Sequence, residues 1–153
     1  MKKIFVASFN RASDGAVSKI KSELDKLGMQ GYDANLVVTH LGINDLEHVD
    51  YILACGDRKE TFEFCLLWYG KIPIIHLWAG EVSQGTHDEI FRWAITHMSM
   101  MQLCTNEEAK KRVDDFFWGF GQKMPNAHIV GNVMLDNMLP LEYDVVLYNP
   151  PTL

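Results

Sequence analysis

The feature that most constrains the fold is a repeated change of periodicity, in which short β-branched runs alternate with segments of helical apolar spacing. Several of the short runs lack a strict apolar-polar alternation, as expected for strands that are covered on both faces of a parallel sheet. This order of elements predicts an α/β fold: a three-layer, Rossmann-like, doubly wound parallel sheet. The expected strands are 3–9, 34–41, 51–56, 72–79, 101–105, 127–131 and 144–149, and the expected helices are 14–28, 59–69, 87–99 and 106–118.

Length and composition narrow the class further. A chain of 153 residues is expected to form a single domain over residues 1–153. The net charge of −6 argues against a nucleic-acid binder. Cys55, Cys65 and Cys104 are widely spaced and odd in number, which predicts neither a disulfide framework nor a zinc site. No apolar run is long enough to span a membrane, and the N-terminal run stops at Asn10 without a signal-peptide core, so we expect a cytoplasmic protein.

Polar residues gather where the expected strands end. In an open α/β sheet, ligands bind beyond the carboxyl ends of the strands, where the following helices also point their free N–H groups. Asp57 and Arg58 follow one such strand, and the ionisable loop 80–92 follows the next. We therefore expect one polar rim, to which the other strand ends contribute Asn10, Arg11, Gly131, Asn132 and Asn149.

Four motifs in this region also carry a family resemblance. They are CGDRKETFEF, IPIIHLWAGEVSQGTHDEIFRWAITHMS, TNEEAKKRV and HIVGNVMLDNML, which span about 51–139 in this order. The chain resembles the N-terminal domain of the UDP-N-acetylglucosamine 2-epimerases, nearest the hydrolysing branch that releases N-acetylmannosamine. FNRASDG and the terminal VVLYNPPTL extend the resemblance. It implies a two-domain GT-B enzyme that holds a nucleotide sugar between Rossmann-like halves, of which this chain would be one half, with the second domain absent.

The resemblance also implies roles for individual residues. Inverting C2 of the sugar requires a base near the C2 hydrogen, and the diphosphate that leaves C1 requires cations and N–H donors. In the family the reaction is thought to pass through a glycal intermediate. The implied catalytic residues are Asp57, Asp88 and Glu89, with no metal and no other cofactor. The implied substrate-binding residues are Arg11, Arg58, Glu81, Arg92, Asn132 and Asn149.

Several of these residues also have a purely structural interpretation. Thr86 and Glu89 form the T-x-x-E pattern of a capping box, with Thr86 as the N-cap and Glu89 reaching back to its N–H. Asp88 would then lie in the first helical turn, where the helix dipole favours any carboxylate. Arg92 lies four residues after Asp88 and could pair with it on the helix surface. Asp57 could cap the helix at 59–69.

Other polar and aromatic residues are expected to serve the fold. The box pattern recurs at 105–108 without any sign of a site. His76 lies within an apolar strand and is expected to be a hydrogen-bonded core histidine, and the remaining histidines show no metal-like spacing. The aromatic cluster at 116–120 is expected to pack in the core or between subunits. Met98, Met100 and Met101 are expected to fill the core.

Two departures from the family pattern divide the functional hypotheses. Trp78 stands where the family carries an ionisable residue, Glu in epimerases and His in the hydrolysing branch, and Asn149 stands where its motif begins with His. The leading hypothesis is a minimal epimerase-like domain acting on or binding a UDP-sugar-like ligand, completed by a homo-oligomer or a separate second-domain chain. The alternative is a non-catalytic module that binds a nucleotide-like metabolite or assembles with another protein.

Overall fold

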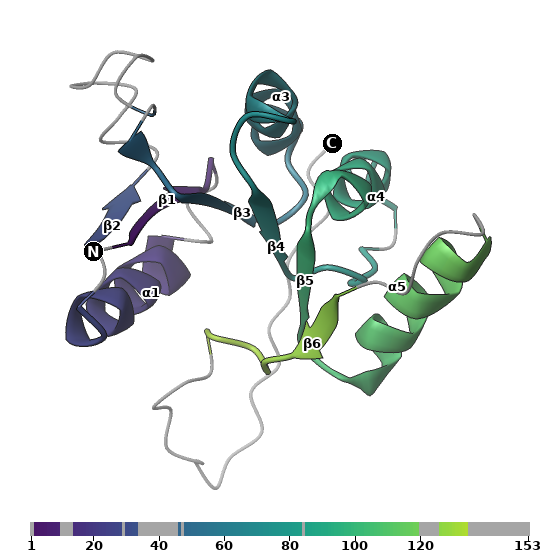
Figure 1. Ribbon diagram of the computed structural model, residues 1–153. Coiled ribbons are helices and arrows are strands. Elements are labelled where there is room, and N and C mark those ends of the chain that lie inside the picture. The colour runs from purple at the N-terminus through teal and green to yellow at the C-terminus, as the bar shows by residue number, and fades with distance from the viewer. Residues whose placement is uncertain are drawn as a thin grey trace, which may run out of the picture.

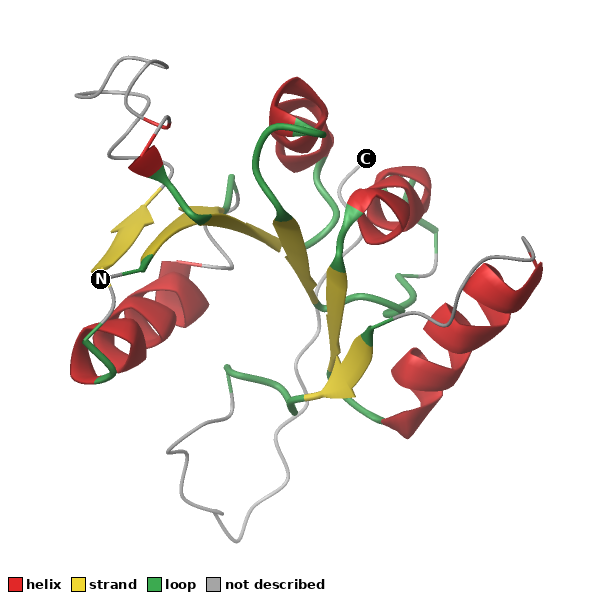
Figure 2. Cartoon of the chain, in the orientation of Figure 1, coloured by secondary structure: helices red, strands yellow, loops and turns green. Residues whose placement is uncertain are grey.

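The computed structural model of the chain describes residues 2–9, 14–28, 30–33, 46, 48–83, 85–119 and 126–134. Strands and helices alternate along these residues, as Figures 1 and 2 show. The strands are β1 (Lys3–Ala7), β2 (Gln30–Asp33), β3 (Tyr51–Cys55), β4 (Ile74–Leu77), β5 (Met101–Cys104) and β6 (Ala127–Ile129). The helices are α1 (Asp14–Lys26), α3 (Lys59–Trp68), α4 (Glu89–Met98) and α5 (Glu107–Gly119).

All strand pairs in the described sheet are parallel, and the strand order is β2-β1-β3-β4-β5-β6. The chain leaves β1 toward β2 on one side and then continues through β3 on the other side. The order therefore reverses between β1 and β3, which is the topological switch point of a doubly wound sheet. This confirms the predicted α/β class and its Rossmann-like winding.

The helices form a layer on each face of the sheet (Figure 1). On one face, Phe5, Ile52 and Ile74 pack against residues of α3 and α4 such as Cys65 and Ile95. A second cluster on this face joins α5 to β5 and contains Cys104, Ala109, Val113 and Phe117. On the opposite face, Val6, Leu53 and Leu77 pack against Val17 of α1. The three layers are thus held by alternate residues of the same strands.

The expected elements differ from the observed ones mainly at one edge of the sheet. Strands β1, β3, β4, β5 and β6 and all four helices fall within their predicted ranges or one residue from them. The edge strand at 30–33 was not predicted, because Gly and Asp are poor strand formers and the backbone pairing with β1 defines it. The expected strands at 34–41 and 144–149 lie outside the described residues.

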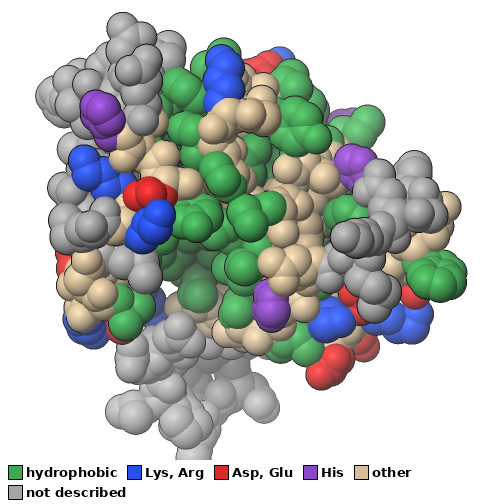
Figure 3. Space-filling view, in the orientation of Figure 1, with side chains coloured by type: hydrophobic (Ala, Val, Ile, Leu, Met, Phe, Trp, Pro, Cys, Tyr) green, Lys and Arg blue, Asp and Glu red, His purple; other side chains and the backbone are tan. Residues whose placement is uncertain are grey.

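The surface separates apolar from charged groups. Figure 3 shows hydrophobic side chains over the middle of one face and Lys, Arg, Asp and Glu side chains mostly at its margins. Met100 is 51% exposed, so the prediction that it fills the core is wrong, whereas Met98 packs against the core. Among the described helices, none is long and apolar enough to cross a membrane.

Candidate functional site

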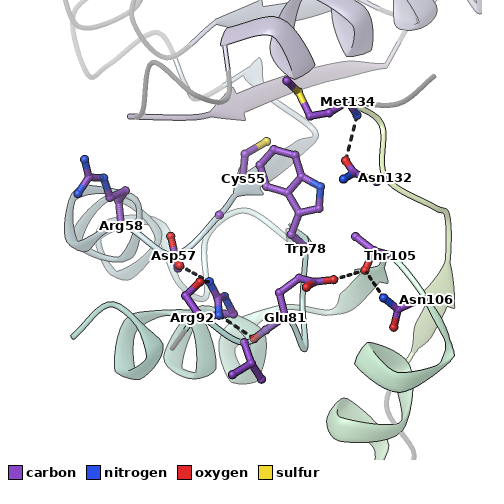
Figure 4. Close-up of a pocket in the computed structure, with 13 residues that line it drawn as sticks. Cys55, Asp57, Arg58, Trp78, Glu81, Arg92, Thr105, Asn106, Asn132 and Met134 are labelled. Atoms are coloured by element: carbon purple, nitrogen blue, oxygen red, sulfur yellow. Dashed lines mark hydrogen bonds and ion pairs between the residues drawn. The ribbon is translucent and has the colours of Figure 1, made fainter. Parts of the chain in front are cut away.

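A cavity of about 690 Å³ opens at the carboxyl ends of β3, β4, β5 and β6 (Figure 4). The turn after each of these strands contributes side chains to it, and α4 contributes Arg92 from behind. The lining residues are Cys55, Gly56, Asp57, Arg58, Trp78, Glu81, Val82, Ser83, Arg92, Thr105, Asn106, Asn132 and Met134. The predicted polar rim is therefore a real pocket in the described part of the chain.

Arg92 organises the floor of this pocket. Its side chain is only 5% exposed and forms ion pairs with Asp57 through Nη2 and with Glu89 through Nη1. Nη1 also donates to the carbonyl of Glu81 at 2.7 Å, and Nη2 donates to Ser83 Oγ at 2.8 Å. We call these five residues the Arg92 cluster. Since four acceptors occupy the four terminal N–H groups, the guanidinium fixes α4, the end of β3 and the loop after β4 in one arrangement.

This arrangement replaces the surface pair expected between Arg92 and Asp88. Arg92 points inward and is 4% exposed as a residue, whereas Asp88 lies 3.9 Å from Arg58 Nη1. Asp88 is the N-cap residue of α4, and it is not among the residues that line the cavity. Asp57 and Asp88 nevertheless lie at the same mouth of the sheet, because the backbone N–H of Arg92 donates to the Asp88 carbonyl while its guanidinium holds Asp57.

The capping box predicted at Thr86 and Glu89 does not form. Glu89 Oε1 accepts from the backbone N–H of Ser83 at 2.5 Å and from Arg92, and Thr86 Oγ1 donates to the Ser83 carbonyl. The carboxylate thus stabilises the loop before α4 instead of capping the helix. The strong buried cation nearby overrides the local pattern, because an ion pair with Arg92 is worth more than one backbone hydrogen bond.

Thr105 and Asn106 were missed by the sequence interpretation, which assigned 105–108 to a capping box without a site. The cap is Asn106, whose Oδ1 accepts from the Ala109 N–H at 2.8 Å. Thr105 Oγ1 instead donates to Glu81 Oε1 within the pocket wall. The rule that ligands bind beyond strand ends would have found both residues, because they directly follow β5.

Asp57 and Glu81 are the carboxylates that line the cavity. Asp57 Oδ2 pairs with Arg92, and Glu81 Oε1 accepts from Thr105. The second oxygen of each carboxylate has no partner among the described residues. Each carboxylate is therefore anchored through one oxygen in the described part of the chain.

The turn after β4 holds Trp78 in an unusual backbone conformation. Its φ of 68° is the only positive value of a non-glycine residue in the described ranges. The following Gly80, with φ of 75°, has no room for a side chain, because an added Cβ would lie 2.8 Å from the Ala109 carbonyl carbon and 2.9 Å from Val113 Cγ2. Arg112 Nε donates to the Gly80 carbonyl at 2.6 Å. The start of α5 thus clamps this turn.

His76 is a hydrogen-bonded core histidine, as predicted. It is fully buried, with Nε2 2.9 Å from the Gly56 carbonyl and Nδ1 2.9 Å from Thr96 Oγ1. Because a carbonyl only accepts, Nε2 carries the proton in the neutral ring. The pKa of His76 is lowered to about 4, mainly by burial and to a smaller extent by the nearby Arg92 charge, against the opposing effect of the Gly56 hydrogen bond. His76 thus ties the end of β3 to α4 as a neutral group.

The cysteines offer little chemistry. Cys55, Cys65 and Cys104 are free and buried. Burial raises the pKa of Cys55 and of Cys65 to about 12 and that of Cys104 to about 11. Cys55 borders the pocket, but a thiol with so high a pKa is a poor nucleophile. No group of three or more metal-ligating side chains is found in the ranges that the structure describes.

The remaining predicted site residues fall into two groups. Asn132 lines the cavity, and its Oδ1 accepts from the Met134 N–H at 3.1 Å. Lys19 Nζ of α1 donates to the Met134 carbonyl at 3.0 Å, so this segment returns from β6 to the start of the chain. Arg11 and Asn149 lie outside the described residues, and their predicted roles stay predictions.

A doubly wound parallel sheet with a polar pocket at its carboxyl edge defines the class as a Rossmann-like α/β domain. The family model described as UDP-N-acetylglucosamine 2-epimerase matches residues 8–149. The chain belongs to this family, which confirms the resemblance seen in its motifs.

Curated relatives agree with this assignment. The chain is 31% identical over 122 residues to the polysialic acid biosynthesis protein P7 of Escherichia coli, which covers 68% of this chain and 30% of that protein. It is 36% identical over 67 residues to the GDP/UDP-N,N'-diacetylbacillosamine 2-epimerase (hydrolyzing) of Campylobacter jejuni, covering 42% of this chain and 17% of the relative. The chain thus matches less than a third of each relative's length.

Solved structures share the fold. The S. aureus MnaA-UDP co-structure superposes with a TM-score of 0.69 at 16% identity, over 95% of this chain and 48% of that one. The Neisseria meningitidis UDP-GlcNAc 2-epimerase bound to UDP-GlcNAc superposes with a TM-score of 0.70 at 18% identity, over 89% of this chain and 47% of the other. The chain therefore spans about half the length of these proteins and has the fold of one half of a GT-B type chain.

Proposed function

We propose that the pocket binds a nucleotide sugar and supports epimerase-like chemistry at the sugar, with Asp57 as the principal proton-transfer group. The observation that carries the proposal is the state of Asp57. One of its oxygens is held by the buried Arg92, and the other is left for a ligand at the end of β3. A carboxylate fixed in this way has a defined direction toward the bound substrate, as a general base requires.

The other lining groups are proposed to orient the ligand. Glu81 presents its second carboxylate oxygen to the hydroxyl groups of the sugar, and Asn132 offers its amide. Arg58 is 49% exposed at the mouth and is the cation best placed for a diphosphate, because the terminal N–H groups of Arg92 are occupied and its Nε is buried. Arg92 is therefore a positioning residue in this proposal, which holds Asp57 and the loop that carries Glu81.

Asp88 and Glu89 are proposed to act around the site. Glu89 stabilises the loop through Ser83 and Arg92, and Asp88 pairs with Arg58 outside the cavity. A direct proton transfer by either residue would require a ligand to reach past the lining side chains. Arg11 and Asn149 are proposed to complete the substrate contacts, in keeping with their positions in the family motifs.

We also propose that full activity needs a second wall for the pocket. The solved relatives are about twice as long as the matched region, since this chain covers 48% and 47% of the two described above. A second domain, in the same polypeptide or in another chain, or a second copy in a homo-oligomer, would enclose the nucleotide. Enclosure matters because small ligands bind well only when most of their surface is buried.

The decisive experiment follows proton exchange at C2 of the sugar. Incubation of the protein with UDP-N-acetylglucosamine in deuterated buffer is expected to exchange the C2 hydrogen, to release UDP, or both. Asp57→Asn is expected to slow this by about 10²- to 10⁴-fold, the usual contribution of a general base. Asp115→Asn, on the outer surface of α5, is the matched control and is expected to change nothing. Equal rates for Asp57→Asn and the parent protein would contradict the proposed role of Asp57.

One observation favours a second candidate function, binding without turnover. Trp78 lines the cavity at the position where the family motif has an ionisable residue, and an indole can neither take nor give a proton near neutral pH. A chain of this kind would bind UDP-N-acetylglucosamine and leave it intact. Calorimetric binding of the intact ligand, with no C2 exchange and no effect of Asp57→Asn, would select this candidate.

A further inference from the structure

Trp78 lies on the side of the sheet opposite to the one that the alternation of side chains along β4 predicts. In β4, Ile74 and His76 face α3 and α4, and Ile75 and Leu77 face α1. The next residue would return to the α4 side in a regular strand. Instead, Trp78 packs with Leu77, Leu53 and Cys55 on the α1 side and borders the cavity.

The backbone turn causes this change of side. Trp78 adopts φ of 68°, a left-handed conformation that is a genuine outlier for a bulky residue. The N–H groups of Trp78 and Ala79 both donate to the Leu103 carbonyl, at 2.9 and 3.2 Å. Together with the clamp on Gly80, these bonds hold the strained turn in place. Strain of this kind gathers at ligand sites, because the surrounding structure must stabilise it.

The indole is supported from behind and open toward the cavity. Cε3 lies 4.0 Å from the position that a Cβ on Gly56 would take, which is ordinary van der Waals distance, so the ring lies beside the turn that follows β3. The indole N–H of Trp78 has no hydrogen-bond partner among the described residues. Figure 4 shows the ring in the middle of the pocket, with Glu81 on one side and Asn132 on the other.

These surroundings fit a sugar ring better than a phosphate. The face of an aromatic ring is electron-rich and attracts the weakly positive C–H groups of a pyranose, whereas it repels an anion. Carboxylate and amide groups beside the ring can bond the equatorial hydroxyl and acetamido groups. Of the two arginines that line the cavity, Arg92 is already paired with two carboxylates. The pocket floor therefore offers little to a diphosphate.

We propose that Trp78 is the platform on which the pyranose ring of the nucleotide sugar stacks, and that it makes the pocket select a sugar-bearing nucleotide over the bare nucleotide. This inference rests on the proposed nucleotide-sugar function and adds a specificity residue to it. The strained turn is then explained as the device that presents the indole to the ligand. The indole N–H is left to donate to a ring substituent.

The test compares two probes, UDP-N-acetylglucosamine and UDP, by calorimetry on the full chain. Trp78→Ala is expected to weaken binding of the sugar nucleotide about tenfold, the size of a good aromatic stacking contact, and to change UDP binding less than twofold. Trp78→Phe keeps an aromatic face and is expected to retain most of the affinity. Trp118→Ala removes an indole that is 78% exposed on α5 and serves as the control.

Each outcome discriminates. Equal weakening of both probes by Trp78→Ala would overturn the inference, because it would place the nucleotide on the indole. Unchanged affinity for both probes would overturn it as well and leave the proposed function standing. Failure of the parent protein to bind either probe would instead defeat the proposed function itself. Where Trp78→Ala unfolds, saturation-transfer NMR on the parent protein replaces it: transfer strongest to sugar-ring protons supports the platform, and transfer strongest to uracil protons overturns it.

Discussion

Two groups of charged residues in this molecule have the same chemistry and different surroundings. The Arg92 cluster joins the end of β3, the loop after β4 and α4 through a guanidinium that is 5% exposed. On the outer surface of α5, Lys111 and Asp115 form a pair of the same sign pattern at 2.5 Å, with side chains 74% and 65% exposed. The distances alone do not distinguish the two groups, because in each group the charged atoms lie within ion-pair distance of their partners.

Burial distinguishes them. Water screens the α5 pair and would solvate either partner alone, so the pair contributes little. In the Arg92 cluster, removal of the Arg92 charge leaves Asp57 and Glu89 unpaired in a poorly solvated place, and that is costly. The buried ion pairs of Arg92 therefore specify one arrangement of the loop after β4. The surface pair adds little to α5, which is already stabilised by its packing against the sheet.

The largest expected effect is that of Arg92→Met. The substitution keeps volume but leaves Asp57 and Glu89 without their cation, so we expect a loss of about 3–5 kcal/mol in the free energy of unfolding by urea denaturation. Arg92→Lys should recover only part of this, because an ammonium cannot bridge two carboxylates in the fixed geometry of the guanidinium.

The control lies in the other region. Lys111→Met is expected to leave the urea midpoint nearly unchanged. Replacing both carboxylates in the Arg92→Met background, as Asp57→Asn with Glu89→Gln, should restore part of the lost stability, because no unpaired charge remains. A loss below about 1 kcal/mol for Arg92→Met would show that the cluster is hydrated like the surface pair.

The second prediction concerns the turn that presents the cluster to the cavity. Gly80 and Gly85 have nearly the same φ, 75° and 79°, but an added Cβ meets nothing within 4 Å at Gly85 and overlaps α5 at Gly80. Gly85→Ala should cost about 1 kcal/mol for the left-handed backbone alone. Gly80→Ala should cost about 3 kcal/mol, because overlap with Ala109 and Val113 is added. Equal effects in thermal unfolding would mean that α5 does not clamp the turn.

The third prediction uses the neutral His76 that supports the cluster from behind. Its pKa is lowered from 6.5 to about 4 in the folded state, so the unfolded chain binds the proton first as the pH falls. Stability is fully present above pH 6.5 and should decrease by about 1.4 kcal/mol per pH unit toward pH 4. Urea denaturation between pH 7 and pH 4.5 measures this slope.

The variants sharpen the assignment. His76→Gln can keep a donor to the Gly56 carbonyl but does not titrate, so its slope in this window should be smaller. His128→Gln changes an exposed histidine of β6 and should keep the parent slope. A parent protein whose stability is constant from pH 7 to pH 4.5 would contradict the burial of a neutral imidazole.

The same comparison explains what the sequence could predict. The fold class could be predicted from the periodicity, because a strand that is buried on both faces is apolar along its whole length. The rim followed from topology, and Asp57, Arg58, Glu81 and Asn132 do line the cavity. Local patterns failed where a distant charge competes with them. The T-x-x-E pattern at Thr86 predicts a helix cap, but Glu89 forms an ion pair with Arg92 instead of capping the helix.

Two features could not be inferred from the residues alone. The edge strand β2 depends on backbone pairing with β1, which residue type hardly records at a Gly and an Asp. The direction of Trp78 depends on a backbone angle that is disfavoured for its residue type, so propensity argues against it. Tertiary contacts determine both the pairing of β2 and the direction of the Trp78 side chain. Of these two features, the direction of Trp78 shapes the pocket.

The smallest expected effect concerns the exposed pair of Lys111 and Asp115. It tests the premise that this pair contributes little to stability. Lys111→Ala and Asp115→Ala should each shift the melting temperature by less than about 1 °C, and the double variant should shift it by no more than their sum. Raising the salt concentration should leave the folding contribution of the Arg92 cluster nearly unchanged, because a buried pair is screened far less than an exposed one. Comparable salt sensitivity of the stability loss in Arg92→Met and Lys111→Ala would remove the distinction between the two regions. In that case, solvation of the charges, and not the buried contacts of Arg92, would determine the conformation of the loop after β4.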